Sequence, residues 1–341
     1  MARKQVRLKD VAEMAGVAVN TASTILNRRP NSWASKETEE RVFEAAKKLG
    51  YRPNRAAVAL QSGRFHSIGL LIADLLNPYF AYVASTLGEA VEERGYDLVI
   101  ENWRMDQEKE KKLLEEFVHR NVDGVAAFVS DVAEHRDFFE SQSKLGFPIV
   151  ALAMPGAGDV PVDMVMPNFE TGLRGAAEAL FELGHRRFVF VTAKSKGQRV
   201  GRRPVLFKGI VDEMEGCETT IVNCGPTVED ARQVAETFLG ETGRPSAVVA
   251  LNDLTAIGVM RAAKDAGMAV PEDLSVVGID GVPLSAQLPV SLSTVEQPHA
   301  AMVAKTVEFL INRIEGDDEQ PLQRAEFATR FVRRESVGPA K

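Results

Sequence analysis

The feature that most constrains the fold is an alternation, from Ser67 onward, of short apolar segments with longer amphipathic ones. The apolar runs have the length of buried strands, and the segments between them place apolar residues at helical spacing. This alternation predicts βαβ units and a parallel sheet. Strands are expected at 68–73, 98–101, 124–128, 149–152, 188–192, 219–223, 247–250 and 276–279, and helices at 79–94, 109–120, 169–183, 228–239 and 254–266. Eight strands are more than one compact doubly wound sheet of this length would hold. Two lobes with a cleft between them are therefore expected.

The first 63 residues follow a different, purely helical pattern. One short amphipathic helix is expected at 8–15, ended by Gly16, and a second at 19–26, stopped at Asn27. Two helices separated by so short a turn make a helix-turn-helix. A third helix is expected to begin after the N-cap Ser35 and to end at Gly50. Its buried side chains are expected to be Val42, Phe43, Ala46 and Leu49.

Charge is divided between these two regions. The whole chain has a net charge of −7, but residues 1–64 hold 13 Lys and Arg against 6 Asp and Glu, whereas the rest holds 28 against 42. A basic head on an acidic body is typical of a protein that binds nucleic acid through its head. The second helix exposes short polar side chains that can reach base edges in a major groove: Asn20, Thr21, Ser23, Thr24 and Asn27.

The segment 51–64 is a short helix former between Pro53 and Gly63. Because isolated helices of two to three turns are marginal in water, we expect it to order only when it packs on a second copy of the chain and on DNA. Leu60 at its far end could then wedge between base steps in the minor groove. A plain linker is the alternative interpretation.

Several motifs resemble the lactose and galactose repressor (LacI/GalR) family along nearly the whole chain. In the head they are LKDVAEMAGV at 8–17, LN at 26–27, LGYRPN at 49–54 and AL at 59–60. In the body they are NPYF at 77–80, VDG at 122–124, LGHRR at 183–187, ND at 252–253, SVVGID at 275–280 and RRES at 333–336. The resemblance implies a helix-turn-helix domain at 1–52, a hinge helix at 53–64 and an effector-binding and dimerisation domain at 65–341.

For the head, the resemblance implies a homodimer on a near-palindromic, double-stranded DNA operator, with the second helix in the major groove. It places the base contacts on Val19, Asn20 and Thr24 and the minor-groove wedge on Leu60. The full set of expected DNA contacts is Val19, Asn20, Thr21, Thr24, Asn27, Asn54, Arg55, Ala59 and Leu60. Three positions depart from the family: Thr24 replaces a frequent arginine, Ala18 a serine N-cap and Arg7 a threonine. The operator is therefore expected to differ from familiar ones.

For the body, the resemblance implies a two-lobed α/β domain of the periplasmic-binding-protein type. Lobe 1 is expected at about 65–166 and 297–322, and lobe 2 at about 167–296 and 323–336. Ligands of open α/β sheets bind outside the carboxyl ends of the strands, where polar and aromatic side chains gather in this sequence. A small-molecule effector, by resemblance a sugar or related metabolite, is therefore expected between the lobes.

The resemblance implies that Arg203 and Asp280 form the effector clamp, with Asn252 beside them and Phe80 as an aromatic face. Trp103, in the loop after the second expected strand, is a further expected contact. A carboxylate and a guanidinium can hold sugar hydroxyls through paired hydrogen bonds, while a ring covers an apolar face. The alternatives are a salt bridge across the cleft for Arg203 and Asp280, and core packing for both aromatics. Ala153 and Pro167 stand where many members have aspartates, and Leu206 replaces a glycine, so a less polar pocket is expected.

The predicted function is a sequence-specific transcriptional regulator, taken as a repressor, whose operator affinity depends on the effector. An activator or a corepressor-dependent regulator remains an alternative, because linkage requires only different affinities in two lobe arrangements. A periplasmic sugar-binding protein is a weaker one, since it would need a signal peptide and would lack a basic head.

An enzyme is disfavoured, since the chain has no GxGxxG after a strand, no phosphate-binding GxxxxGK[ST] and no GxSxG. The histidines lack metal spacing, and Cys217 and Cys224 fit neither a disulfide framework nor a CxxC motif. No catalytic residue, metal or cofactor is therefore expected. The apolar runs are too short to cross a bilayer, so no membrane partner is expected. The charged N-terminus lacks the apolar region of a secretory signal, so a cytoplasmic location is expected. The end of the sequence carries no heptads, which favours a dimer.

Overall fold

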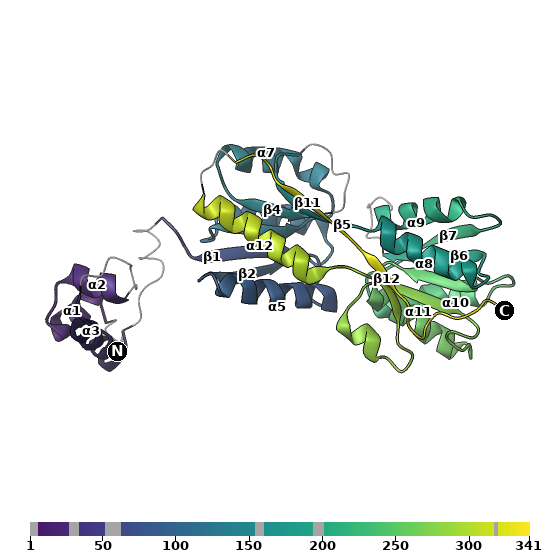
Figure 1. The fold of residues 1–341 in the computed structure, drawn as a ribbon, viewed down its shortest axis with the longest axis horizontal. Coiled ribbons are helices and arrows are strands. Elements are labelled where there is room, and N and C mark those ends of the chain that lie inside the picture. Colours follow the sequence, from purple (N-terminus) through teal and green to yellow (C-terminus); the bar gives the residue numbers. More distant parts are fainter. Residues whose placement is uncertain (1–5, 27–33, 52–62, 154–159, 194–200, 317–319) are drawn as a thin grey trace. The chain divides into compact units, whose positions relative to one another are not determined.

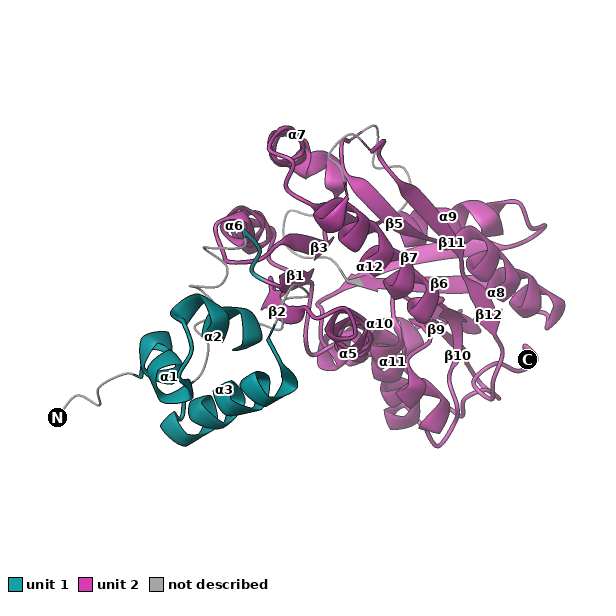
Figure 2. Cartoon of the chain, turned by 60° about the vertical axis from the view of Figure 1, so that its left-hand side comes forward, with its two compact units in different colours: residues 1–65 teal, residues 66–341 magenta. Residues whose placement is uncertain are grey.

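The computed structural model describes residues 6–26, 34–51, 63–153, 160–193, 201–316 and 320–341. The chain forms two compact units, Met1–Phe65 and His66–Lys341, which are coloured separately in Figure 2. Each unit has its own core, as the two sequence patterns predict. Within the described residues, no helix is long and apolar enough to cross a membrane.

The first unit contains the three expected helices, α1 (Leu8–Ala15), α2 (Val19–Leu26) and α3 (Lys36–Leu49). The ends of α1 and α3 have local causes. Gly16 and Gly50 stop them in the left-handed conformation, at φ of +67° and +66°. Ser35 Oγ accepts the main-chain N–H of Thr38 at 3.3 Å and so caps α3. At α1, the Arg7 side chain has no acceptor for a cap, and instead the Asp10 carboxylate accepts the Arg7 N–H at 2.8 Å.

Small and branched side chains from all three helices form the core of the first unit. They are Val11, Ala12, Ala15, Ala22, Ile25, Val42, Ala45 and Ala46. The expectation that Phe43 is buried is wrong, because its side chain is 41% exposed and Ala45 lies in the core instead. Phe43 directly follows Val42, so it is turned about 100° away around the helix and reaches only the rim of the apolar face.

The second unit has two six-stranded sheets, each with helices on both faces (Figure 1). The first sheet is entirely parallel, in the order β11-β5-β4-β3-β1-β2. Its strands are β1 (Ser67–Ile72), β2 (Asp97–Asn102), β3 (Gly124–Phe128), β4 (Ile149–Leu152), β5 (Asp163–Asn168) and β11 (Arg324–Ala328). One face packs against α5 (Pro78–Glu92) and α12 (His299–Glu315), the other against α6 (Gln107–Val118) and α7 (Arg136–Lys144).

The second sheet has the order β12-β10-β9-β8-β6-β7, with only β12 antiparallel. Its strands are β6 (Arg187–Ala193), β7 (Glu218–Cys224), β8 (Ala247–Ala250), β9 (Ser275–Asp280), β10 (Ser293–Glu296) and β12 (Arg330–Val332). The helices α8 (Glu170–Glu182) and α9 (Arg202–Asp212) cover one face, and α10 (Val228–Leu239) and α11 (Asp253–Asp265) the other. Short 3₁₀ turns lie at Val132–His135 and Pro283–Gln287.

The chain passes between the sheets after β5, after β10 and after β11. All eight expected strands are present, but the lobe boundaries differ from those expected. Residues 323–328, expected in lobe 2, include β11, which pairs with β5 in the first sheet, and β5 itself extends to Asn168. The last crossing therefore lies near Thr329. Because β11 is an edge strand with alternating exposed and half-buried residues, it has no apolar run to mark it.

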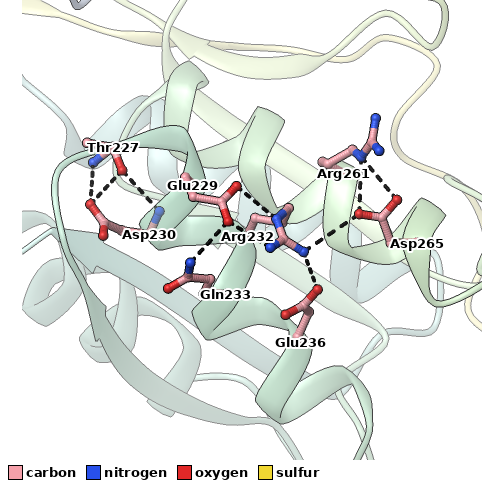
Figure 3. Close-up of polar contacts among 8 residues, drawn as sticks. All are labelled: Thr227, Glu229, Asp230, Arg232, Gln233, Glu236, Arg261 and Asp265. Carbon is pink, nitrogen blue, oxygen red and sulfur yellow. Dashed lines mark hydrogen bonds and ion pairs between the residues drawn. The ribbon is translucent and has the colours of Figure 1, made fainter.

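The helices α10 and α11 lie in close contact beneath an exposed ion-pair network (Figure 3). A Cβ on Gly258 would lie 2.4 Å from the Val228 carbonyl oxygen, so only glycine permits this approach. Arg232 pairs with Glu229 and Glu236 on its own helix, and reaches Asp265 on α11 at 3.7 Å. This packing sets the position of α11, whose first residues lie next to the cavity described below.

Candidate functional site

A cavity of about 250 Å³ lies where the carboxyl ends of strands from both sheets meet. All five residues expected to contact an effector line it: Phe80, Trp103, Arg203, Asn252 and Asp280. They come from elements far apart in the sequence, and each lies at the end of a strand, just after one, or at the start of the following helix. This carboxyl edge is where open α/β sheets bind ligands.

Asp280 ends β9 and is the most buried charged group of the cavity, with 3% of the residue exposed. Its main chain has φ of +111°, a conformation that side-chain-bearing residues rarely adopt. The amide of Gln297 donates to Asp280 Oδ1 at 2.9 Å. Burial raises the pKa of Asp280 to about 7, against the lowering effect of Arg203 and with a further rise from the charge of Asp253.

Arg203 lies in the first turn of α9 and is only loosely paired with Asp280. Its Nη1 is 3.9 Å from Asp280 Oδ1 and donates instead to the main-chain oxygen of Leu251 at 3.0 Å. The guanidinium stacks on Phe169, with 4.3 Å between Cζ and the ring centroid. The alternative interpretation required a salt bridge across the cleft. Both charged residues belong to the second sheet and its helices, so their pairing does not cross the cleft.

Asn252 precedes α11 and serves as its N-cap. Its Oδ1 accepts the main-chain N–H of Thr255 at 2.8 Å and the Thr255 hydroxyl at 2.9 Å. The amide oxygen is therefore committed to the helix, and a ligand contact by this residue would be made through the amide N–H group.

The aromatic side chains of the cavity come from the first sheet and α5. Trp103 follows β2 and is 3% exposed, and its indole N–H donates to the Phe128 carbonyl oxygen at 3.1 Å. Phe80 is half-buried and packs edge-on against Phe128, with ring centroids 5.2 Å apart. Trp103 therefore combines core packing with cavity lining, so the two interpretations given for it are compatible.

The expected set omitted five polar residues of the cavity: Asp74, Asn77, Tyr79, Ser130 and Gln297. Asn77 caps α5, since its Oδ1 accepts the Tyr79 N–H at 3.0 Å. The Tyr79 hydroxyl donates to Gln297 Oε1 at 3.4 Å and links α5 to the crossing after β10. The NPYF motif after the first strand points to Asn77 and Tyr79. Gln297 had no comparable indication, because it follows β10, a strand that the apolar pattern does not predict.

In the first unit, α2 carries the expected base contacts that the structure describes. Val19 is 43% exposed, Asn20 is exposed, and Thr21 and Thr24 are partly exposed. The Thr24 hydroxyl donates to the Asn20 main-chain oxygen at 2.9 Å, one turn back along the helix. Five other expected DNA contacts lie outside the described residues: Asn27, Asn54, Arg55, Ala59 and Leu60.

Comparison with known families matches both units. Residues 7–54 match the family of bacterial regulatory proteins of the lacI type, and residues 177–337 match a periplasmic binding protein-like domain. The ribose operon repressor of Halalkalibacterium halodurans is 33% identical over 332 residues, which cover 97% of this chain and 96% of that repressor. Catabolite control protein A of Staphylococcus xylosus is 32% identical over 86% of this chain and 88% of its own length.

Solved structures agree with these matches. A LacI family transcriptional regulator from Arthrobacter sp. FB24, in complex with lactose, has a TM-score of 0.70 at 27% identity and covers 80% of this chain and 99% of its own. The lac repressor dimer bound to operator and an anti-inducer shares the fold over 98% of this chain and all of its own, with a TM-score of 0.82 at 23% identity. Motifs, fold and relatives therefore agree: this chain belongs to the LacI family of DNA-binding transcriptional regulators.

Proposed function

We propose that this regulator represses transcription by binding a near-palindromic operator as a homodimer, and that a sugar or related polyol in the cavity controls its operator affinity. Its place of action is the cytoplasm, where the operator is. The observation that carries the proposal is the cavity itself, which joins a buried carboxylate and a guanidinium with four aromatic side chains. Two relatives support the proposal: one is named a ribose operon repressor, and the other is a regulator whose structure is in complex with lactose.

A sugar matches this arrangement because it presents hydroxyl groups along its edge and an apolar face on its ring. The Asp280 carboxylate can accept hydrogen bonds from two hydroxyls, and the Arg203 guanidinium can donate to their oxygens. The rings of Phe80 and Trp103 offer the apolar contact. Small-molecule sites usually exceed about 300 Å³, so a cavity of about 250 Å³ favours a small ligand.

The ion pair and the aromatic rings of the cavity lie on different walls, which orients the ligand. Arg203 and Asp280 come from the second sheet and its helices. The wall of the first sheet includes Leu152, Ala153 and Pro167 beside the aromatic rings, with Asp74, Asn77 and Ser130 at its strand ends. We therefore expect the hydroxyl-rich edge of the ligand to face Arg203 and Asp280. The first lobe then contacts an apolar face or an apolar substituent.

For the operator, we propose that α2 enters the major groove and contacts bases through Val19, Asn20 and Thr24. Thr24 has a short side chain whose hydroxyl is bonded to its own helix, so its reach is limited. Replacing Thr24 with arginine supplies a long donor fork that favours guanine. We expect Thr24→Arg to change the preferred half-site. An unchanged half-site would contradict the role given to Thr24.

The experiment that tests the whole proposal is selection of bound sequences from random DNA by the full chain, repeated with ribose, lactose, cellobiose and nucleosides. We expect a near-palindromic site and at least one compound that lowers its occupancy. If about eight phosphates are contacted per dimer, log affinity should fall with log salt at a slope of roughly −7. A compound that raises occupancy would instead identify a corepressor. A flat salt dependence would contradict DNA binding by this head.

A further inference from the structure

Asp253 is a buried carboxylate that the cavity does not account for. It is the first residue of α11, is 1% exposed, and does not line the cavity, although its neighbour Asn252 does. An acidic residue in the first turn of a helix ordinarily interacts with that helix's own N–H groups. Both oxygens of Asp253 are instead engaged by residues that follow β9 and belong to β10.

These contacts fix the main chain directly after Asp280. Asp253 Oδ2 accepts the Val282 N–H at 2.8 Å, and Oδ1 accepts the Thr294 hydroxyl at 2.6 Å. The Thr294 hydroxyl oxygen in turn accepts the Gly281 N–H at 3.2 Å. Both N–H groups that follow Asp280 are thus bound to Asp253, one directly and one through Thr294.

The neighbouring residues are shaped for this arrangement. A Cβ on Gly278 would lie 2.2 Å from Asp253 Oδ1, so only glycine at this position of β9 lets the carboxylate approach the strand. Farther along, the Ser285 hydroxyl donates to the Val282 carbonyl oxygen at 2.7 Å, and Arg334 Nη1 donates to Ser285 Oγ at 3.0 Å. The loop is therefore held at the N–H and the carbonyl of the same residue.

We propose that Asp253 is a positioning residue that holds the loop after β9 and thereby keeps Asp280 in its rare conformation, with its carboxyl group at the cavity. The φ of +111° at Asp280 costs free energy and persists only where the surroundings fix it. Asp253 supplies that restraint from behind the cavity wall. The value of this restraint for ligand binding rests on the proposed role of Asp280, but the restraint itself can be tested without any ligand.

Asp253 also acts on the charge of Asp280. Its own burial raises the pKa of Asp253 to about 6, and its negative charge contributes to the raised pKa of Asp280. The other groups that face the two carboxylates are Arg203 from α9, Asn77 and Tyr79 at the start of α5, Gln297 after β10, and Thr294, Ser285 and Arg334 around Asp253.

The test compares Asp253→Asn with Asp265→Asn in the ligand-free full chain. Asp265 is a carboxylate at the other end of the same helix, where it pairs with Arg232 and Arg261 (Figure 3). We expect Asp253→Asn to raise the hydrogen-exchange rates of the Gly281 and Val282 amides at least tenfold, while those of β8 are unchanged. Carboxyl carbon NMR, assigned with Asp280→Asn, should show a lowered pKa for Asp280. Asp265→Asn should change neither quantity.

The proposal is overturned if folded Asp253→Asn protein keeps wild-type exchange at Gly281 and Val282, or a wild-type titration of Asp280. A general rise in exchange over all of β8 and β9 would overturn it too, because that would show a merely structural role. If Asp253→Asn does not fold, Thr294→Val removes only the bridging hydroxyl and should release the Gly281 amide alone. Because no sugar is used, absence of ligand binding would contradict the proposed function without affecting this test.

Discussion

The two walls of the cavity differ in how their side chains are held. On the wall of the second sheet, Arg203 and Asp280 are fixed by hydrogen bonds to Leu251 and Gln297, and the loop after Asp280 is bound to Asp253. On the opposite wall, Phe80 and Trp103 extend the hydrophobic core of the first sheet. The charged wall is thus held by hydrogen bonds between buried polar groups, whereas the aromatic wall is held mainly by ring and apolar packing around Phe128. Substitutions should therefore have large effects on the first and graded effects on the second.

The largest effect is expected at Arg203. Replacing it with alanine removes the charge-assisted donors and leaves the buried Asp280 without its nearby cation. Hydrogen bonds to charged groups contribute about 1.5–3 kcal/mol each, so ligand affinity should fall by roughly 100-fold or more. Isothermal titration with the sugar found by selection measures this. The exposed neighbour Arg202 gives the matched control, since Arg202→Ala should bind as the wild type does. Equal losses in both variants would contradict the assignment.

The next effect is a pH dependence that belongs to the charged wall. With its pKa raised to about 7, Asp280 is largely protonated below neutral pH in the free protein. Ligand hydroxyls donate to the carboxylate, so binding favours the charged form and releases a proton. Affinity should therefore be constant above pH 7 and fall by up to about tenfold per unit below it. Asp280→Asn should remove the dependence. An affinity that rises as pH falls would indicate an anionic ligand instead.

A smaller, graded effect is expected on the aromatic wall. Phe80→Ala removes one ring contact with the ligand. We expect it to weaken ligand binding by about 1–2 kcal/mol, or roughly tenfold. Phe80→Leu should recover part of it, because an apolar surface is kept. The loss should be larger for a ligand with an apolar substituent than for the matching unsubstituted sugar. Identical losses for the two ligands would argue against the proposed orientation.

The smallest effect is expected at the surface network of Figure 3. Arg232 is 25% exposed in its side chain and pairs with three carboxylates that are themselves well exposed. Because water screens exposed ion pairs, Arg232→Ala should lower the free energy of unfolding only slightly. Ligand affinity should stay unchanged. A tenfold loss of affinity would show that the position of α11 depends on this surface network.

A helix or strand could be predicted from the sequence where residues close to it along the chain define its ends. The helices of the first unit could be placed to the residue because Gly16, Ser35 and Gly50 act on their immediate neighbours. Strands with apolar runs could be placed for the same reason. The edge strand β11 could not, since its half-buried residues carry no such run and its pairing with β5 joins segments 160 residues apart.

The cavity shows the same limit. Arg203, Asn252 and Asp280 could be predicted from motifs and from the loops that follow strands. Gln297 could not, because its role comes from its contact with Asp280 and Tyr79, which only the tertiary structure brings together. The part played by Asp253 likewise depends on a contact with the loop after β9. The sequence motifs thus locate the residues that form the wall of the site. The hydrogen bonds that hold these residues in place are known only from the tertiary structure.

The central claim is that a ligand held by the charged wall changes operator affinity. The direct test measures affinity of the full chain for its selected operator, with and without saturating sugar, in the wild type and in Arg203→Ala. Coupling of about 1–3 kcal/mol is usual between such sites, so we expect at least tenfold weaker operator binding by the liganded wild type. Arg203→Ala should bind the operator equally well with and without the same sugar concentration. A sugar that binds the wild type yet leaves operator affinity unchanged, or that acts equally on both proteins, would contradict the account.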